Sequence, residues 1–176
     1  MTTEPTHGQP AVIAFGSNLG DRAATLQAAA ADLAAAEGVE LVAISGLHES
    51  IAIKPGGADP TAPGYLNAVA LIRTRLAPVA LLTLLHSIEA DHGRVRTDDG
   101  ERWGDRTLDL DLIDFAGRTH EAHGDGPTIP HPRAHERDFV LRPWLEVDPD
   151  AVLPGHGRVA DLLAALNAAG HPEPTS

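Results

Sequence analysis

The chain of 176 residues predicts an α+β sandwich in which helices pack against a mostly antiparallel sheet. Strand-like and helix-like patterns interleave along it, with short linkers and no internal repeat. The length suits one domain, and 43% hydrophobic with 22% charged residues is close to the globular average. We therefore expect a single domain over residues 11 to 170, preceded by a disordered tail at 1 to 10 and followed by a short tail at 171 to 176.

The first half of the chain predicts two strands around one helix. Residues 11 to 15 are apolar and end at a Gly-Ser-Asn-Leu-Gly-Asp stretch, which is typical of a strand followed by a turn and a helix start. Helical spacing of apolar residues then continues to Gly38, a natural stop. Residues 39 to 47 alternate as a strand does. Six Pro and Gly residues between 54 and 64 favour an irregular surface loop.

The second half repeats this alternation. Residues 66 to 74 resemble a strand, and Pro78 opens a helix at the position where proline is tolerated. A loop at 94 to 106 leads into residues 107 to 115, whose strict alternation predicts another strand. A last helix is indicated by apolar residues at helical spacing before Gly170, namely Val159, Leu162, Leu163 and Leu166.

Composition excludes several functional classes. The chain has no cysteine, so disulfides, thiol nucleophiles and cysteine-bound zinc are ruled out. It has no apolar run of 18 residues and no signal-like start, so we expect a cytoplasmic protein without a membrane partner. The net charge of −12 argues against nucleic-acid binding, because an anionic partner needs a cationic surface.

The strand at 107 to 115 carries the first candidate site. Successive side chains of a strand point to opposite faces, so Asp109 and Asp111 share one face while Leu108, Leu110 and Leu112 face the other way. Magnesium is typically bound by one or two carboxylates together with the phosphates of a substrate. The spacing also fits an acidic face exposed to solvent, and Asp-x-Asp alone does not distinguish the two.

The loop at 94 to 106 concentrates arginine in an acidic chain. Arg94 and Arg106 lie at its two ends, and one guanidinium group can bind two phosphate oxygens at once. A solvated loop held by salt bridges is the alternative. Trp103 lies among these polar residues, where it either covers a nucleotide base or anchors the loop.

A second polar cluster extends from Ile129 to Phe139 and contains His131, His135 and Arg137. Histidines four residues apart can bind zinc on a helix, but prolines on both sides of His131 disfavour a helix there. Hydrogen bonding from a histidine to a phosphate oxygen fits better. Glu89 lies beside the apolar stripe of the helix that begins at Pro78, either at the site or simply solvated.

These segments, taken in order, resemble those of the 6-hydroxymethyl-7,8-dihydropterin pyrophosphokinase family. The resemblance covers about residues 11 to 165, and its most specific part is Arg-Trp-Gly-Asp-Arg-Thr-Leu-Asp-Leu-Asp, followed by Pro-His-Pro and Arg-Asp-Phe. The matching segments are Phe15 to Gly20, Tyr65 to Asn67, Glu89, Gly93 to Arg96, Glu101 to Gly104, Arg106 to Asp111, Pro130-His131 and Arg137 to Phe139.

The resemblance implies a sandwich related to the ferredoxin-like fold and an enzyme of folate biosynthesis. Such an enzyme moves the terminal diphosphate of ATP to the hydroxymethyl oxygen of a reduced pterin and releases AMP. By matching position, Asp109 and Asp111 would hold two magnesium ions, and Arg94 and Arg106 would contact the phosphates during transfer. The residues around ATP would be Glu89, Trp103, Leu112, His131 and Arg137. Those around the pterin would be Tyr65, Asn67 and Phe139.

The chain departs from the family pattern at Ser50-Ile-Ala-Ile53, where many members have a Thr-x-Pro-x-Gly-like stretch. Two other functions stay open at this stage. One is a magnesium-dependent phosphotransferase or nucleotidyltransferase that uses the same aspartates on a different acceptor. The other is a non-catalytic binding domain. For the enzyme we expect small-molecule partners only and a monomer.

Overall fold

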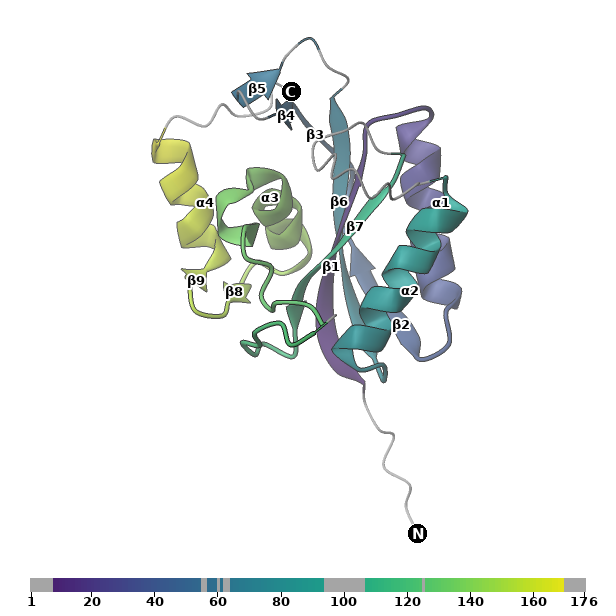
Figure 1. Cartoon of the computed structure of the whole chain (residues 1–176). Helices are drawn as coiled ribbons and strands as arrows, with labels where there is room; N and C mark the ends of the chain where they lie inside the picture. The colour runs from purple at the N-terminus through teal and green to yellow at the C-terminus, as the bar shows by residue number, and fades with distance from the viewer. Residues whose placement is uncertain are drawn as a thin grey trace.

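The computed structural model describes residues 8–54, 57–59, 61, 64–93, 107–124 and 126–169. A five-stranded antiparallel sheet forms the middle layer, with helices on both faces (Figure 1). This arrangement confirms the predicted α+β sandwich with a mostly antiparallel sheet.

The sheet has the order β2-β6-β1-β7, and β3 pairs with β6 as well. These strands are β1 (Gln9–Ser17), β2 (Val39–Ile44), β3 (His48–Ser50), β6 (Tyr65–Thr74) and β7 (Asp109–Phe115). Every ladder is antiparallel. Because β1 begins at Gln9 and pairs with β6 from there, Gln9 and Pro10 belong to the sheet and not to the tail expected at 1 to 10.

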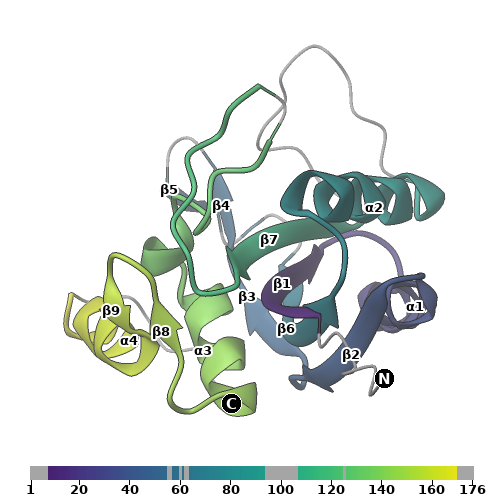
Figure 2. The ribbon, with the colours of Figure 1, turned by 90° about the horizontal axis from the view of Figure 1, so that it is seen from below.

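Helices α1 (Arg22–Ala35) and α2 (Pro78–Asp91) cover one face of the sheet (Figures 1 and 2). Helix α1 begins after Asp21, whose carboxylate accepts a hydrogen bond from the Ala24 backbone N–H at 3.1 Å. The apolar stripes predicted for both helices are buried here, against sheet residues such as Ile13, Phe15 and Leu110. None of the helices within the described ranges is long and apolar enough to cross a membrane.

The other face is covered by α3 (Asp138–Val147) and α4 (Val159–Ala168), with a short 3-10 turn η1 (Ala134–Glu136) and the hairpin β8 (Val152–Leu153) and β9 (Gly157–Arg158). Figure 2 shows α3 between the sheet and α4. Sequence patterns predicted α4 but not α3, which carries Pro143 in its interior. Leu141 and Trp144 of α3 pack with Val69 and Ile113 of the sheet in a second core cluster.

The segment at 54 to 64 corrects one prediction. We expected no regular structure there, yet β4 (Ala52–Lys54) and β5 (Gly57–Asp59) form a two-stranded antiparallel sheet of their own. Strand pairing uses backbone groups, which glycine and small residues supply as well as others do. Counting turn-forming residues therefore missed a short hairpin.

Candidate active site

A row of paired residues crosses the sheet near the C-terminal end of β1. Gly16 of β1 lies opposite Asn67 of β6 on one side and opposite Asp109 of β7 on the other, and His48 of β3 pairs with Asn67. Directly opposed residues in antiparallel strands point to the same face. Since Gly16 has no side chain, it leaves a floor between the amide of Asn67 and the carboxylate of Asp109.

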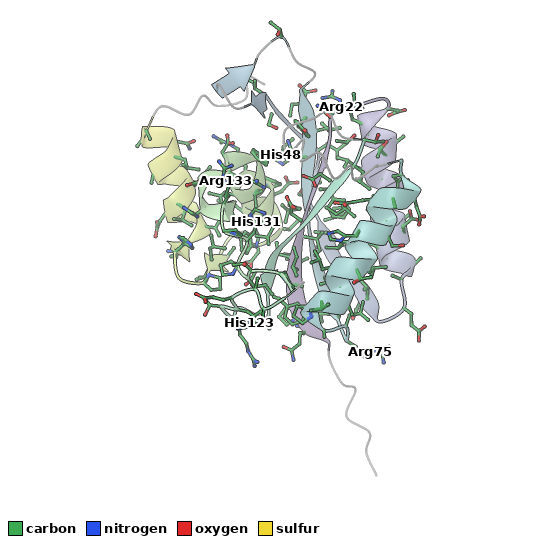
Figure 3. The ribbon with its side chains drawn as sticks, in the orientation of Figure 1. Arg22, His48, Arg75, His123, His131 and Arg133 are labelled. Carbon is green, nitrogen blue, oxygen red and sulfur yellow. The ribbon has the colours of Figure 1, made fainter. Side chains whose placement is uncertain are left out.

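The next row identifies the face. It contains Val69, Ala14 and Asp111, and Val69 and Ala14 belong to the core cluster shared with α3. The polar row therefore lies on the α3 side of the sheet. Figure 3 shows His48 and His131 on this same side.

The predicted division of the β7 side chains is confirmed. Leu108, Leu110 and Leu112 are buried against α1 and α2, whereas Asp109 and Asp111 are half-buried on the α3 side. Oδ2 of Asp111 accepts a hydrogen bond from Nη1 of Arg137 at 3.3 Å, which makes an ion pair. One carboxylate is thus already held opposite a cation from the other layer.

The donor chemistry of the aspartate pair fits magnesium. Carboxylate oxygens are hard ligands, and Mg²⁺ keeps several waters while it binds to one or two of them. Within the described ranges, no group of three or more His, Cys, Asp or Glu residues converges as a metal site. Two carboxylates completed by substrate phosphates are the arrangement that these residues can offer.

Arg137 and Phe139 lie where η1 leads into α3. The Arg137 guanidinium carbon is 5.7 Å from the centroid of the Phe139 ring, within the range of a cation–π contact. Phe139 is half-buried and packs against the α3 core cluster. The start of α3 therefore places a cation near Asp111 and an aromatic ring beside it.

His131 is fixed beside the free edge of β7. Its backbone N–H donates to the carbonyl of Ile113 at 2.8 Å, and its Nδ1 accepts from the Arg133 N–H at 3.2 Å. An accepting Nδ1 leaves the proton of a neutral ring on Nε2. Burial lowers the pKa of His131 from 6.5 to about 4, and Arg137 acts in the same direction while Asp109 opposes it. His131 is accordingly a neutral hydrogen-bond donor at physiological pH.

Asn67 is 3% exposed and held from the β3 side. Its Nδ2 donates to the His48 carbonyl at 3.1 Å and to Ser50 Oγ at 2.7 Å. Tyr65, two residues earlier on β6, shares its face and is half-buried. An aromatic ring and an oriented amide therefore lie together at the start of β6.

Glu89 is 1% exposed, so the alternative of a plain solvated residue is wrong. Its Oε1 accepts a hydrogen bond from the Leu110 N–H at 2.8 Å, at the edge of β7 that faces away from β1. The Leu112 side chain is 4% exposed and lies in the core with Ile13. Only the backbone of Leu112 lies at the edge of the sheet.

Not every predicted residue converges here. The ring of His135 stacks on His156, with centroids 4.2 Å apart, instead of pairing with His131. Arg94, Trp103 and Arg106 fall outside the described residues. Conversely, sequence reasoning missed the contact of Ser50 with Asn67, because the pairing of β3 with β6 had no visible signal.

Comparison with known proteins gives one consistent result. A family model described as 7,8-dihydro-6-hydroxymethylpterin-pyrophosphokinase matches residues 12–149. The 2-amino-4-hydroxy-6-hydroxymethyldihydropteridine pyrophosphokinase of Synechocystis is 40% identical over 157 residues, which cover 89% of this chain and 75% of that protein. The protein of the same name from Haemophilus influenzae is 39% identical over 153 residues, 87% of this chain and 90% of that one.

Solved structures agree in fold. A crystal structure of Plasmodium falciparum HPPK-DHPS with pteroate matches 92% of this chain with a TM-score of 0.68 and 13% sequence identity. The chain spans 43% of that longer protein. At this identity the match establishes the fold alone.

Proposed function

The chain belongs to the 7,8-dihydro-6-hydroxymethylpterin-pyrophosphokinase family, and from this premise we propose that it transfers the terminal diphosphate of ATP to 6-hydroxymethyl-7,8-dihydropterin, in folate biosynthesis. The observation that carries the proposal is the polar row on the α3 side of the sheet. It sets Asn67, suited to a flat heterocycle, one strand away from Gly16 and two strands away from Asp109, suited to a metal.

The pterin is proposed to lie over Gly16. Tyr65 and Phe139 would hold its faces, and the Asn67 amide would hydrogen-bond to its edge. Aromatic rings and an amide suit a flat, polar heterocycle, because they bury its faces and satisfy its polar edge. Tyr65 and Asn67 share one face of β6, which supports this placement.

Asp109 and Asp111 are proposed to hold two magnesium ions together with the phosphates of ATP. When bound, the ions neutralise charge on the phosphate oxygens and orient the transferred group. Nε2–H of His131 would donate to a phosphate oxygen, and a neutral ring does so without the cost of burying another cation. Arg137, now paired with Asp111, would contact the phosphates as well.

The nucleoside of ATP is proposed to lie along the free edge of β7. Leu110 N–H bonds to Glu89 and the Ile113 carbonyl to His131, so Leu112 lies between two anchored points of this edge. Because its side chain is in the core, Leu112 would contact the nucleoside through its backbone. Trp103 is proposed to cover the nucleoside, and Arg94 and Arg106 to contact the phosphates during transfer.

The reaction needs no covalent intermediate. The hydroxymethyl oxygen of the pterin forms a bond to the β-phosphorus of ATP, and the bond from that phosphorus to the oxygen bridging to the α-phosphate breaks. AMP leaves with the bridging oxygen, and the hydroxyl proton is released. The residues act by holding the two oxygens in line and by balancing charge.

We further propose that the enzyme is a cytoplasmic monomer with one catalytic domain, which begins with β1 at Gln9 and continues to about residue 170. The absence of cysteine and the packing of helices on both faces of one central sheet support this organisation. Its partners would be ATP and the reduced pterin, without nucleic acid or membrane.

Product analysis tests the function. Incubation with ATP, magnesium and the hydroxymethyl dihydropterin is expected to yield AMP and the pterin diphosphate. Asp111→Asn should lower kcat by at least about a hundredfold, because a metal ligand at the transferred group is weakened. Asp114→Asn, on the same strand but bonded to the Gly117 N–H, is the matched control and should stay active.

Other products point to other functions. ADP in place of AMP would indicate a different phosphotransferase. A binding domain would show neither turnover nor magnesium-dependent binding of an ATP analogue. Full activity in Asp111→Asn would contradict the metal assignment even if AMP appears.

A further inference from the structure

One side chain of α3 bonds to the segment that leads into β3, the strand next to Asn67. Glu146, near the end of α3, accepts a hydrogen bond from the Gly46 N–H at 2.8 Å through Oε1 and bonds His48 Nε2 at 2.6 Å through Oε2. Gly46 and His48 lie about a hundred residues away, where β2 leads into β3. The pKa of Glu146 is lowered, most by the hydrogen bond from the Gly46 N–H and then by the one to the His48 ring, because both stabilise the carboxylate.

The same segment orients Asn67. The His48 carbonyl and Ser50 Oγ both bond to Nδ2 of Asn67. A carbonyl can only accept, so the amide nitrogen must face β3. Both of its hydrogens are used there, which leaves Oδ1 as the atom of Asn67 that can meet a ligand.

The geometry around Gly16 shows where Oδ1 lies. A Cβ atom built on Gly16 would be 3.5 Å from Asn67 Oδ1 and 3.6 Å from Cδ1 of Tyr65. Oδ1 therefore borders the floor left by Gly16. A ligand on this floor would meet a hydrogen-bond acceptor, and so must offer an N–H donor at its edge.

We propose that Glu146 and His48 are positioning residues for the acceptor substrate: they hold the His48 carbonyl and Ser50 so that Asn67 presents Oδ1 to an N–H edge of the pterin. The inference rests on the proposed function, since it deepens the role of Asn67. Neither side chain is proposed to contact a substrate. They act through the backbone of β3.

The contact of Glu146 with Gly46 and His48, called the clamp below, can be removed without unfolding the sheet. Ser45, one residue before Gly46, is bonded to β6 without any help from Glu146. Its N–H donates to the Val69 carbonyl at 2.9 Å, and its Oγ accepts a hydrogen bond from the Val69 N–H at 3.0 Å. Glu146 is 46% exposed. Removing its carboxylate should therefore loosen the segment from Gly46 to His48 and shift β3 slightly, while the ladder from β3 to β6 keeps the strand in the sheet.

Steady-state kinetics of Glu146→Ala test the proposal. KM for the pterin should rise about three- to tenfold, the effect of one lost neutral hydrogen bond. KM for ATP and kcat should change less than about twofold, because the aspartates are on the other side of Gly16. Glu146→Gln keeps an acceptor for the Gly46 N–H and should restore most of the pterin affinity.

Asp32→Ala provides the control. Asp32 bonds His92 Nε2 at 2.7 Å and joins α1 to α2, so its loss removes a similar His–carboxylate contact far from β3. It should leave KM for the pterin unchanged. Parallel rises in both KM values, no rise in Glu146→Ala, or the same rise in Asp32→Ala would overturn the proposal.

Failure of the proposed function would be seen separately, as absence of AMP from the wild-type protein. The comparison then uses calorimetry, with the pterin titrated into wild type and Glu146→Ala in the presence of a non-hydrolysable ATP analogue. Weaker pterin binding in the variant supports the clamp. Equal binding, or no binding by the wild type, overturns it.

Discussion

His131 illustrates how a neighbourhood sets the chemistry of one residue. The proline-flanked segment that carries it is bonded to the Ile113 carbonyl, and the ring is close enough to Arg137 and Asp109 for both charges to act on it. Burial and the nearby guanidinium both disfavour the imidazolium form. A charged histidine would have attracted phosphate more strongly but would have added to the positive charge of Arg137 in a half-buried place.

The pKa of His131 is directly measurable. In an NMR titration of the ligand-free protein, the His131 ring should titrate near pH 4, well below 6.5. Arg137→Gln should raise this pKa, because it removes a cation that opposes protonation. Arg142→Gln is the control, since Arg142 pairs with Asp138 and does not act on His131.

The lowered pKa of His131 also makes the stability of the fold depend on pH. The pKa of His131 is lower in the folded than in the unfolded protein, so as the pH falls the unfolded chain takes up the proton first. The free energy of unfolding should therefore decline between pH 6.5 and about 4. His131→Asn should flatten this decline in thermal melts. A ring that titrates near 6.5 would contradict the account.

Individual residues were predictable where a local pattern decides their orientation. Strict alternation was sufficient to place Asp109 and Asp111 on one face of β7, since a strand has period 2. The roles of Ser50, His48 and Glu146 were not predictable, because they depend on the register of β3 against β6 and on the packing of α3. Neither the register of β3 nor the packing of α3 produces a recognisable pattern in the local sequence.

Among the elements, β7 carries both proposed metal ligands and forms one edge of the sheet. One edge pairs with β1, and the other bonds to the side chain of Glu89 and the backbone of His131. An edge strand exposes backbone donors and acceptors that need partners. Glu89 supplies one of them from α2, whose apolar stripe is buried against the sheet.

Removing that partner should destabilise the fold. Glu89→Ala leaves the buried Leu110 N–H without this acceptor and is expected to cost about 1 to 3 kcal/mol in denaturant unfolding. Glu89→Gln retains an acceptor and should lose less. Glu136→Ala, whose carboxylate is 52% exposed and bonds Arg133, is the control and should change stability by less than about 1 kcal/mol. Equal losses in Glu89→Ala and Glu136→Ala would refute the edge-capping role.

The elements also show where pattern reading stops. Helices α1, α2 and α4 and the long strands were predicted, because each repeats an apolar stripe over several turns or pairs. Helix α3 was missed although Trp144 and Leu141 are buried, since Pro143 within the segment argues against a helix. Its position next to the polar cluster at 129 to 139 is what gives the site a second wall.

At the scale of the molecule, the proposed site lies between the sheet and the layer that contains α3. The Arg137–Asp111 pair and the Glu146–His48 bond both cross from α3 to the sheet. A site between two layers suits two substrates, because the sheet and the α3 layer each supply residues to the proposed pterin subsite and to the proposed ATP subsite. The overall charge of −12 does not favour ATP, so local cations and magnesium must offset it.

Thermal stabilisation by ligand tests this balance on the whole molecule. A non-hydrolysable ATP analogue at about 100 times its Kd should add about 2.7 kcal/mol and raise Tm by roughly 5 to 10 °C, but only with magnesium present. Magnesium alone should shift Tm little, because the phosphates that complete its coordination are missing. The analogue alone should also shift Tm little, because its negative phosphates would face the carboxylates of an acidic chain. Asp109→Asn should remove most of the combined shift, whereas Asp150→Asn, at a carboxylate 95% exposed, should retain it. A full shift without magnesium would mean that arginines alone hold the phosphates and that the aspartates are an acidic face and not a metal site.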